Sequence, residues 1–439
     1  MAVTASGGTP EARGPPAPSA GQVGVPGLSE SVNCFCCHFY RYLIEVDSKN
    51  ETVIGLPWIT NTFGISGGVP LQKRDYSLDL LKTLGCVLML FAHSHVATDG
   101  WITHQLVFLG TFAPVIFFSV SGVTTVLQLR ARSAGSLFLF YALFFFLGLS
   151  FVGAKGVNFW HEPQCEVPQG IALGVIATTF LVRWLGPEMS GFLFPLPFLL
   201  HLMAKKMAIP ASIATGFLVP PGLFPLFPWL AFFLWGIFCY SHQRTAVLVT
   251  LGAGAAYAVL SLQGLGHCEK WDMNTQYFLV GLVLYGFLAV VRPFIQAVPG
   301  WLVYLGRRSL FFFYAHYLLL YLWHRSTLPA VPALVWPLVL AGVVALSLAF
   351  ERINRLVEPA CFLTPSRAAT FWVLMLGTVL LSPTLVPAPW LPPLSYVCGF
   401  LFALNYRQLS TLVLEVVGGM RGLFRHRAGV GRRVSGPAR

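Results

Sequence analysis

The chain has 439 residues, of which 56% are hydrophobic and only 10% are charged, and its mean hydropathy is +0.71. Soluble domains carry roughly 25% charged residues, so this composition leaves too little charge to cover a water-facing surface. The net charge of +12 is explained by basic loops beside anionic lipid, without nucleic acid. These values exclude a soluble enzyme, a disordered scaffold and a nucleic-acid-binding domain.

The N-terminal segment differs from the rest of the chain. Residues 1–30 are rich in Pro, Gly, Ala and Ser and contain no apolar run of signal-peptide length, so we expect a disordered or loosely structured tail over residues 1–73. Cys34, Cys36 and Cys37 are spaced too tightly for a usual zinc site. We therefore expect palmitoylation or free thiols there, and no metal.

Apolar runs of about 15 to 22 residues, the length that crosses a hydrocarbon core, follow one another after residue 73. They predict an all-α, polytopic integral membrane protein with about 10–12 transmembrane helices in one bundle over residues 74–405, and a basic cytoplasmic tail over residues 406–439. The expected spans are 79–97, 105–128, 136–153, 170–185, 191–204, 223–241, 246–262, 277–297, 309–324, 330–350 and 369–387, with a short twelfth stretch at 394–405.

Lys and Arg residues predict the orientation, because cytoplasmic loops carry an excess of them. They fall on alternate loops and in the C-terminal tail, so both termini are predicted to be cytoplasmic, in a membrane that the sequence does not specify. The sequon at Asn50 then lies in the cytoplasm, where it stays unmodified. Cys165 and Cys268 fall in two loops of the opposite face, and a disulfide between them is an open possibility.

Ionisable side chains inside spans are costly to bury and are therefore candidates for function. Lys82 and His93 lie eleven residues apart, close to three helical turns, so they share one helix face about 16 Å apart along the axis. Asp79 lies one turn before Lys82 and can pair with it. The alternative for Asp79 and Lys82 is a helix start with a snorkelling lysine.

Two later segments also carry polar groups within apolar runs. Residues 114–122 (PVIFFSVSG) contain small residues, which in a span usually indicate close helix packing. His316 lies seven residues after Ser309 and follows the pair Arg307 and Arg308. A neutral histidine at that depth needs a partner or a wet cavity, and a neighbouring hydroxyl is the purely structural solution.

The polar positions of three segments resemble the motifs of the membrane acyltransferase-3 family. Lys82 and His93 resemble its Arg/Lys-x10-His pattern on the first helix, and residues 117–122 (FFSVSG) resemble its FFxxSG element. Residues 306–316 (GRRSLFFFYAH) resemble its late GxxSLxxYxxH element. Residues 77–79 (SLD) and 227–236 (FPWLAFFLWG) look more like the related heparan-α-glucosaminide N-acetyltransferase-like proteins. The usual Arg-Gly pair of the first helix is Lys82-Thr83 here.

This resemblance implies transfer of an acyl group, most often acetyl, from cytoplasmic acyl-CoA to a sugar hydroxyl or amine of a glycan or glycolipid. Acyl-CoA is then a co-substrate, and no tightly bound cofactor is expected. The partners are the lipid bilayer, acyl-CoA and the acceptor. The implied catalytic candidates are His93, His316 and Asp79. The candidates for binding the CoA phosphates are Lys82, Arg130, Arg132, Arg307 and Arg308, and those for the acceptor or the oxyanion are His104, Ser121, Ser309 and Tyr314.

Several alternatives stay open at this point. The catalytic histidine can be His93, His104 or His316, acting as a general base or as a nucleophile. The transfer can be direct or proceed through an acyl-enzyme. A multi-pass carrier with an intramembrane His/Asp proton relay and a non-catalytic member of the acyltransferase fold are the competing functions. The oligomeric state is undetermined.

Overall fold

A computed structural model describes residues 75–94, 100–162, 164–207, 213–219, 223–295, 297–326 and 331–430. The expected tail, Asn50 and the Cys34, Cys36 and Cys37 cluster lie outside these residues. The described residues form helices and no strand, and nine of their helices are long and apolar enough to cross a membrane. The all-α, multi-pass class is confirmed; the cytoplasmic placement of the termini stays a prediction.

The first helices alternate with short loops, as the apolar runs predicted. α3 begins where the side chain of Asp75 accepts a hydrogen bond from the Ser77 N–H at 3.1 Å, which satisfies one free donor of the first turn. The helices of this half are α3 (Tyr76–His93), α4 (Trp101–Gly110), α5 (Ala113–Ala131), α6 (Ala134–Ala154), α7 (Val167–Phe192), α8 (Pro195–Lys206), α9 (Ile213–Leu218) and α10 (Leu226–Ser241).

The second half ends in a helix of 40 residues. This helix, α17, passes through residues 405 and 406, so the expected boundary between membrane domain and tail lies inside one helix. The elements of this half are α11 (Gln243–Leu262), α12 (Thr275–Val291), η1 (Arg292–Phe294), α13 (Gly300–Arg307), α14 (Ser309–Arg325), α15 (Pro332–Phe362), α16 (Pro365–Leu385), η2 (Ala388–Trp390) and α17 (Leu391–Val430).

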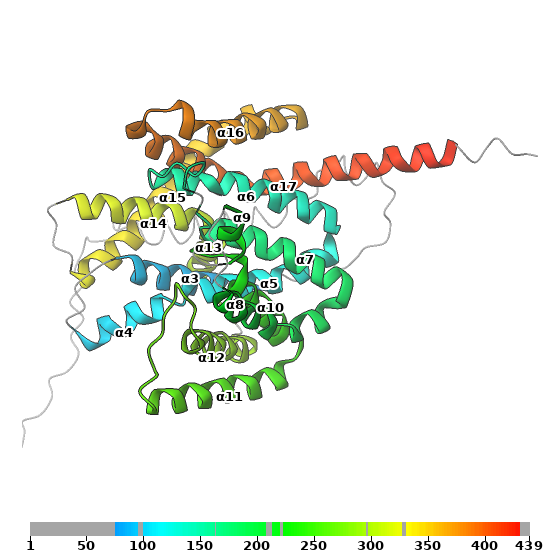
Figure 1. The fold of residues 1–439 in the computed structure, drawn as a ribbon. Coiled ribbons are helices and arrows are strands. Elements are labelled where there is room, and N and C mark those ends of the chain that lie inside the picture. The colour runs from blue at the N-terminus through cyan, green and yellow to red at the C-terminus, as the bar shows by residue number, and fades with distance from the viewer. Residues whose placement is uncertain are drawn as a thin grey trace, which may run out of the picture. The chain divides into compact units, whose positions relative to one another are not determined.

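α10 packs tightly against α5 and α7 in the core (Figure 1). A Cβ atom on Gly122 would lie 2.0 Å from the Phe233 carbonyl oxygen, and one on Gly236 would lie 2.1 Å from that of Ser119. Only glycine permits this approach of two backbones. The expected packing role of small residues in the segment 114–122 therefore holds for Gly122. By contrast, α11 is mostly exposed and has the apolar surface of a lipid-facing helix.

One expected span, 105–128, is interrupted by a turn, although Trp101–Ala131 as a whole is long and apolar enough to cross a membrane. α4 ends at Gly110 and α5 begins at Ala113, because Pro114 lacks the N–H that a continuous helix would use and fits the first turn of a new one. The freed carbonyl of Thr111 accepts a hydrogen bond from the Tyr277 hydroxyl at 2.8 Å. Broken backbone at membrane depth is tolerated where protein or a cavity covers it, and this break borders a cavity.

Candidate active site

Two predicted residues, His93 and His316, form a hydrogen-bonded pair. His93 is the last residue of α3 and His316 lies in the middle of α14, with 3.0 Å between His93 Nδ1 and His316 Nε2. The other ring nitrogen of His316, Nδ1, lies 2.9 Å from the Phe312 carbonyl oxygen. A carbonyl only accepts, so His316 Nδ1 carries the proton and its Nε2 is an acceptor. His93 must then donate from Nδ1, which leaves its Nε2 unprotonated when both rings are neutral.

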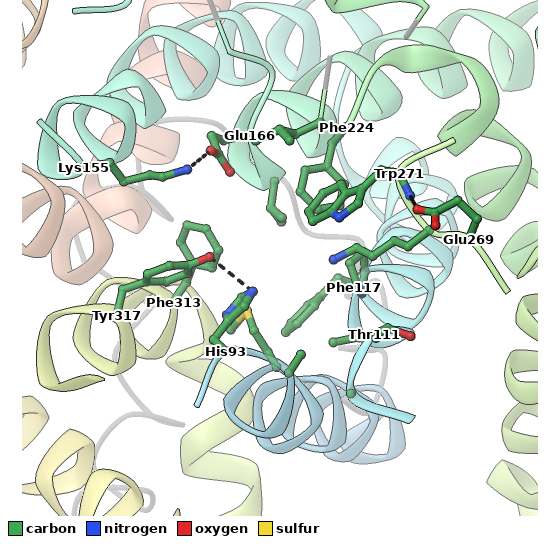
Figure 2. Close-up of a pocket in the computed structure, with 18 of the residues that line it drawn as sticks. His93, Thr111, Phe117, Lys155, Glu166, Phe224, Glu269, Trp271, Phe313 and Tyr317 are labelled. Carbon is green, nitrogen blue, oxygen red and sulfur yellow. Dashed lines mark hydrogen bonds and ion pairs between the residues drawn. The ribbon is translucent and has the colours of Figure 1, made fainter. Parts of the chain in front are cut away.

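The unprotonated Nε2 of His93 faces a cavity (Figure 2). The Tyr317 hydroxyl lies 3.2 Å from it and donates to it, and the two rings pack with centroids 4.6 Å apart. His316 is fully buried, whereas His93 is half-buried. The basic nitrogen Nε2 of His93 therefore borders the cavity, while His316, which orients the His93 ring, is buried.

The cavity has a volume of about 610 Å³, and we call it the histidine pocket. Its walls come from the end of α3, the break between α4 and α5, α14 and the loops that precede α7 and α12. Figure 2 shows His93 and Tyr317 on one side of it, with Phe224 and Trp271 on the opposite side. The size and the mixed polar and aromatic lining are typical of sites for small molecules.

Charged side chains from two loops line the same pocket. Lys155 Nζ lies 2.5 Å from the Glu166 carboxylate, which is buried. Lys270 Nζ lies 4.3 Å from the centre of the Trp271 ring and 5.2 Å from that of Phe224. Burial lowers the pKa of Lys270 from its ordinary value of 10.5 to about 8, and the negative charge of Glu166 opposes this effect.

Polar contacts hold the loop before α12 in place. The Asn274 side chain accepts from the Glu269 N–H at 3.1 Å and donates to the His267 carbonyl at 2.8 Å. Lys205 of α8 forms an ion pair of 2.5 Å with Asp272. These contacts fix the segment that carries Lys270 and Trp271.

The possible disulfide between Cys165 and Cys268 is not formed, and both thiols are free. Cys165 is buried and donates its S–H to the Phe224 carbonyl at 2.9 Å, while the Phe224 N–H donates to the Cys165 carbonyl at the same distance. Cys268 instead lines the histidine pocket. Cys165 therefore pins the aromatic wall of the pocket through Phe224, a role that its position in a loop did not predict.

A second, smaller cavity of about 190 Å³ lies next to the first, and we call it the Lys82 pocket. Three of the predicted residues line it: Lys82, Ser121 and Ser309. Phe117, Val167 and Phe313 line both cavities, so these three side chains separate the two. The predicted motifs on α3, α5 and α14 thus meet along one path through the core.

Asp79 lines neither cavity. It is 3% exposed, and its carboxylate lies 3.7 Å from Lys82 Nζ and 3.8 Å from Arg307 Nε. The expected pairing of Asp79 with Lys82 is therefore present. A direct part for Asp79 in chemistry at His93 has no geometric support, because its oxygens belong to the ion pairs at the start of α3.

The remaining predicted residues lie away from both cavities. Arg308 forms an ion pair of 2.7 Å with Glu351, and the Tyr314 hydroxyl is buried against that of Ser150 at 2.8 Å. Arg132 donates to the Ser410 hydroxyl. His104 of α4 and Arg130 at the end of α5 are exposed.

Sequence reasoning missed most of the polar wall of the histidine pocket. Lys155 and Glu166 lie just outside two apolar runs, and Lys270 and Trp271 lie in a loop, where position alone indicates only solvent exposure. Tyr317 directly follows His316, and its proximity to a candidate histidine was the one available indication.

Comparisons of the chain with protein-family models, curated proteins and solved structures gave no match. Among the residues that the structure describes, no three His, Cys, Asp or Glu side chains are grouped closely enough to hold a metal ion.

Proposed function

We propose that this protein is a membrane-embedded acyltransferase, which moves an acyl group, acetyl by preference, from acyl-CoA to an acceptor hydroxyl or amine. The observation that carries the proposal is the unprotonated Nε2 of His93, oriented by His316 and facing the histidine pocket. A base held by a second group, beside a cavity that fits a small molecule, is the arrangement that activates a nucleophile.

His93 acts as the general base. The acceptor replaces the Tyr317 hydroxyl at Nε2 and gives up its proton there as its oxygen or nitrogen attacks the thioester carbon. The carbon–sulfur bond breaks, the protonated His93 passes the proton to the thiolate, and free CoA leaves. His316 does not touch the substrates: by accepting from His93 Nδ1 it holds the ring and stabilises the positive charge that develops on it.

The acyl donor enters through the Lys82 pocket. Lys82 lines this pocket, and its positive charge favours phosphate groups there. Ser121 and Ser309 line the same pocket and are the hydroxyl donors nearest to the path of the thioester. Phe117 and Phe313 narrow the way to His93, which favours a short acyl group.

A carrier is the second candidate, because two neighbouring cavities that share three lining side chains also suit a solute pathway. In that case the histidine pair carries a proton with the solute. A carrier needs no CoA and moves solute or protons across sealed vesicles, whereas a transferase releases CoA in detergent solution.

The test uses purified full-length protein in detergent with acetyl-CoA labelled in its acetyl group. Glucose, glucosamine, glucuronate and a membrane lipid extract serve as acceptor probes, and release of CoA and movement of label are both measured. We expect His93→Ala to lower turnover by about 100-fold or more, the size of a lost general base. His161→Ala is the matched control, since His161 is exposed in a loop away from both cavities.

Undiminished turnover in His93→Ala would contradict the assignment, and its loss in His104→Ala would move the base to α4. Absence of both CoA release and label transfer with the wild-type protein would overturn the transferase. Proton uptake that follows solute entry into vesicles would then favour the carrier.

A further inference from the structure

Two lysines line the histidine pocket, and only one of them has a counter-ion among the described residues. Lys155 is neutralised by Glu166. Glu269 accepts a hydrogen bond from the Trp271 N–H at 3.2 Å and lies 3.8 Å from His267. The ammonium group of Lys270 makes no hydrogen bond or ion pair with any of the residues that the structure describes, although Lys270 borders the cavity.

Lys270 is half-buried. An ammonium group that is withdrawn from water without a counter-ion is costly, and ring faces offset only a part of that cost. Lys270 lies over Trp271 and Phe224, at 4.3 and 5.2 Å from their ring centres. The ring contacts hold the side chain at the wall of the cavity, and they leave its N–H donors without oxygen acceptors. An anionic group in the pocket would supply these acceptors.

The position of Lys270 relative to His93 fits one ligand that contacts both sides of the pocket. Trp271 and Phe224 lie across the cavity from His93 (Figure 2), and flat aromatic faces of this kind bind the apolar faces of sugar rings. A volume of about 610 Å³ is in the range of small-ligand sites and holds a monosaccharide unit with a charged substituent.

We propose that the acceptor of this site, whose existence rests on the proposed acyl transfer, is an anionic sugar: its carboxylate or phosphate binds Lys270, its ring lies on Trp271, and its reacting group faces His93. The shared chemistry is a negatively charged oxygen group, which a uronic acid or a sugar phosphate supplies equally. The lowered pKa of Lys270 agrees with an empty counter-ion position, because a bound anion would raise that pKa again.

Binding is tested without acyl-CoA, so that the result does not depend on turnover. Full-length protein in detergent at pH 7 is titrated with two pairs of probes, glucuronate against glucuronamide and glucose 6-phosphate against glucose, by equilibrium dialysis. The two members of each pair share the sugar ring, and only one of them carries the anionic group. Comparing the two pairs distinguishes binding of a carboxylate from binding of a phosphate.

We expect the wild-type protein to bind at least one anionic probe about tenfold or more tightly than its neutral partner, which corresponds to about 1.4 kcal/mol. Lys270→Met should remove this preference while it keeps the aliphatic stem on Trp271, and Lys270→Arg should retain most of it. Lys206→Met is the matched control, since Lys206 is exposed at the end of α8. The wild-type preference should also fall between pH 7 and 9, as the ammonium loses its proton.

Equal binding of charged and neutral probes by the wild-type protein would overturn the proposal. So would the absence of binding of either anionic probe at about 10 mM, a concentration far above the range of a metabolite site. An unchanged preference in folded Lys270→Met would overturn it as well. Should Lys270→Met not fold, Lys270→Gln and the pH dependence of the wild-type protein decide the question. A failure of His93→Ala to reduce transfer would instead count against the proposed function and leave these binding results intact.

Discussion

The two ends of the path through the core use their charges in opposite ways. At the Lys82 end, the buried carboxylate of Asp79 is shared by Lys82 and Arg307, and Arg308 is paired with Glu351. In the histidine pocket, Lys270 has no ionic partner among the described residues, and His93 keeps a basic nitrogen turned to the cavity.

The difference separates groups that stabilise the structure from groups available to a ligand. A charge in an internal pair is already satisfied, and a ligand must displace its partner before it binds. A charge that borders a cavity without such a partner gains by binding an ion of opposite charge. Arg307 and Arg308, which the motif resemblance implies in CoA binding, are paired with Asp79 and Glu351. His93 and Lys270 instead border the histidine pocket.

Removing the carboxylate at the Lys82 end should have the largest effect. Asp79→Asn leaves Lys82 and Arg307 without their buried counter-ion, and we expect the free energy of unfolding to fall by about 3 kcal/mol, seen as a lower midpoint of thermal unfolding in detergent. Asp75→Asn is the control, because Asp75 is 39% exposed in its pair with Arg292 and should cost about 1 kcal/mol or less. Equal losses in the two variants would contradict a special role for the buried pair.

In the histidine pocket, Lys270 should make the stability of the protein rise with pH. The pKa of Lys270 is lowered from 10.5 to about 8, so between these values the unfolded chain binds more protons than the folded protein, and stability rises with pH. Lys270→Met lacks this penalty. We expect the variant to be more stable by about 2 kcal/mol below pH 8, and the difference to disappear by pH 10.5.

Thermal unfolding of wild type and Lys270→Met at pH 7, 9 and 10.5 measures that difference, with Lys206→Met as the reference. A gap that stays constant across the series would show that Lys270 carries no buried charge.

The pairing of the histidines predicts a smaller, kinetic effect. His316→Leu removes the acceptor of His93 Nδ1 without touching the substrates, so kcat should fall about tenfold while the KM for acetyl-CoA stays the same. His316→Gln places an amide oxygen near the position of Nε2 and should restore a part of kcat. If KM rises instead, or if Gln and Leu behave alike, His316 does not position His93.

The side chains that separate the two cavities predict the smallest effect. Phe117→Leu removes part of the wall that Phe117 and Phe313 form between the two cavities. On the proposed route of the acyl group, we expect the ratio of butyryl to acetyl transfer to rise about threefold. Phe146→Leu is the control, since Phe146 is exposed on α6. An unchanged ratio would place the acyl group elsewhere.

The sequence predicted the helices better than it predicted the loops. Apolar run length located most spans, because a hydrocarbon core demands about 20 apolar residues whatever the protein does. It missed the break at Thr111, where Pro114 begins a new helix, since the freed carbonyl is satisfied by Tyr277, a residue far away in the sequence. The sequence also left open whether Cys165 and Cys268 form a disulfide, because that depends on the distance and orientation of the two thiols in the folded protein.

The sequence by itself determined the multi-pass helical class and the face that Lys82 and His93 share on α3, since composition and helical periodicity are local properties. Only the tertiary structure decided that His93 meets His316, 223 residues later in the chain, and that Asp79 meets Arg307. Only it decided that two loops bring Lys270 and Trp271 to the same cavity. Contacts between distant segments depend on how helices pack, and no local pattern encodes the resulting distances.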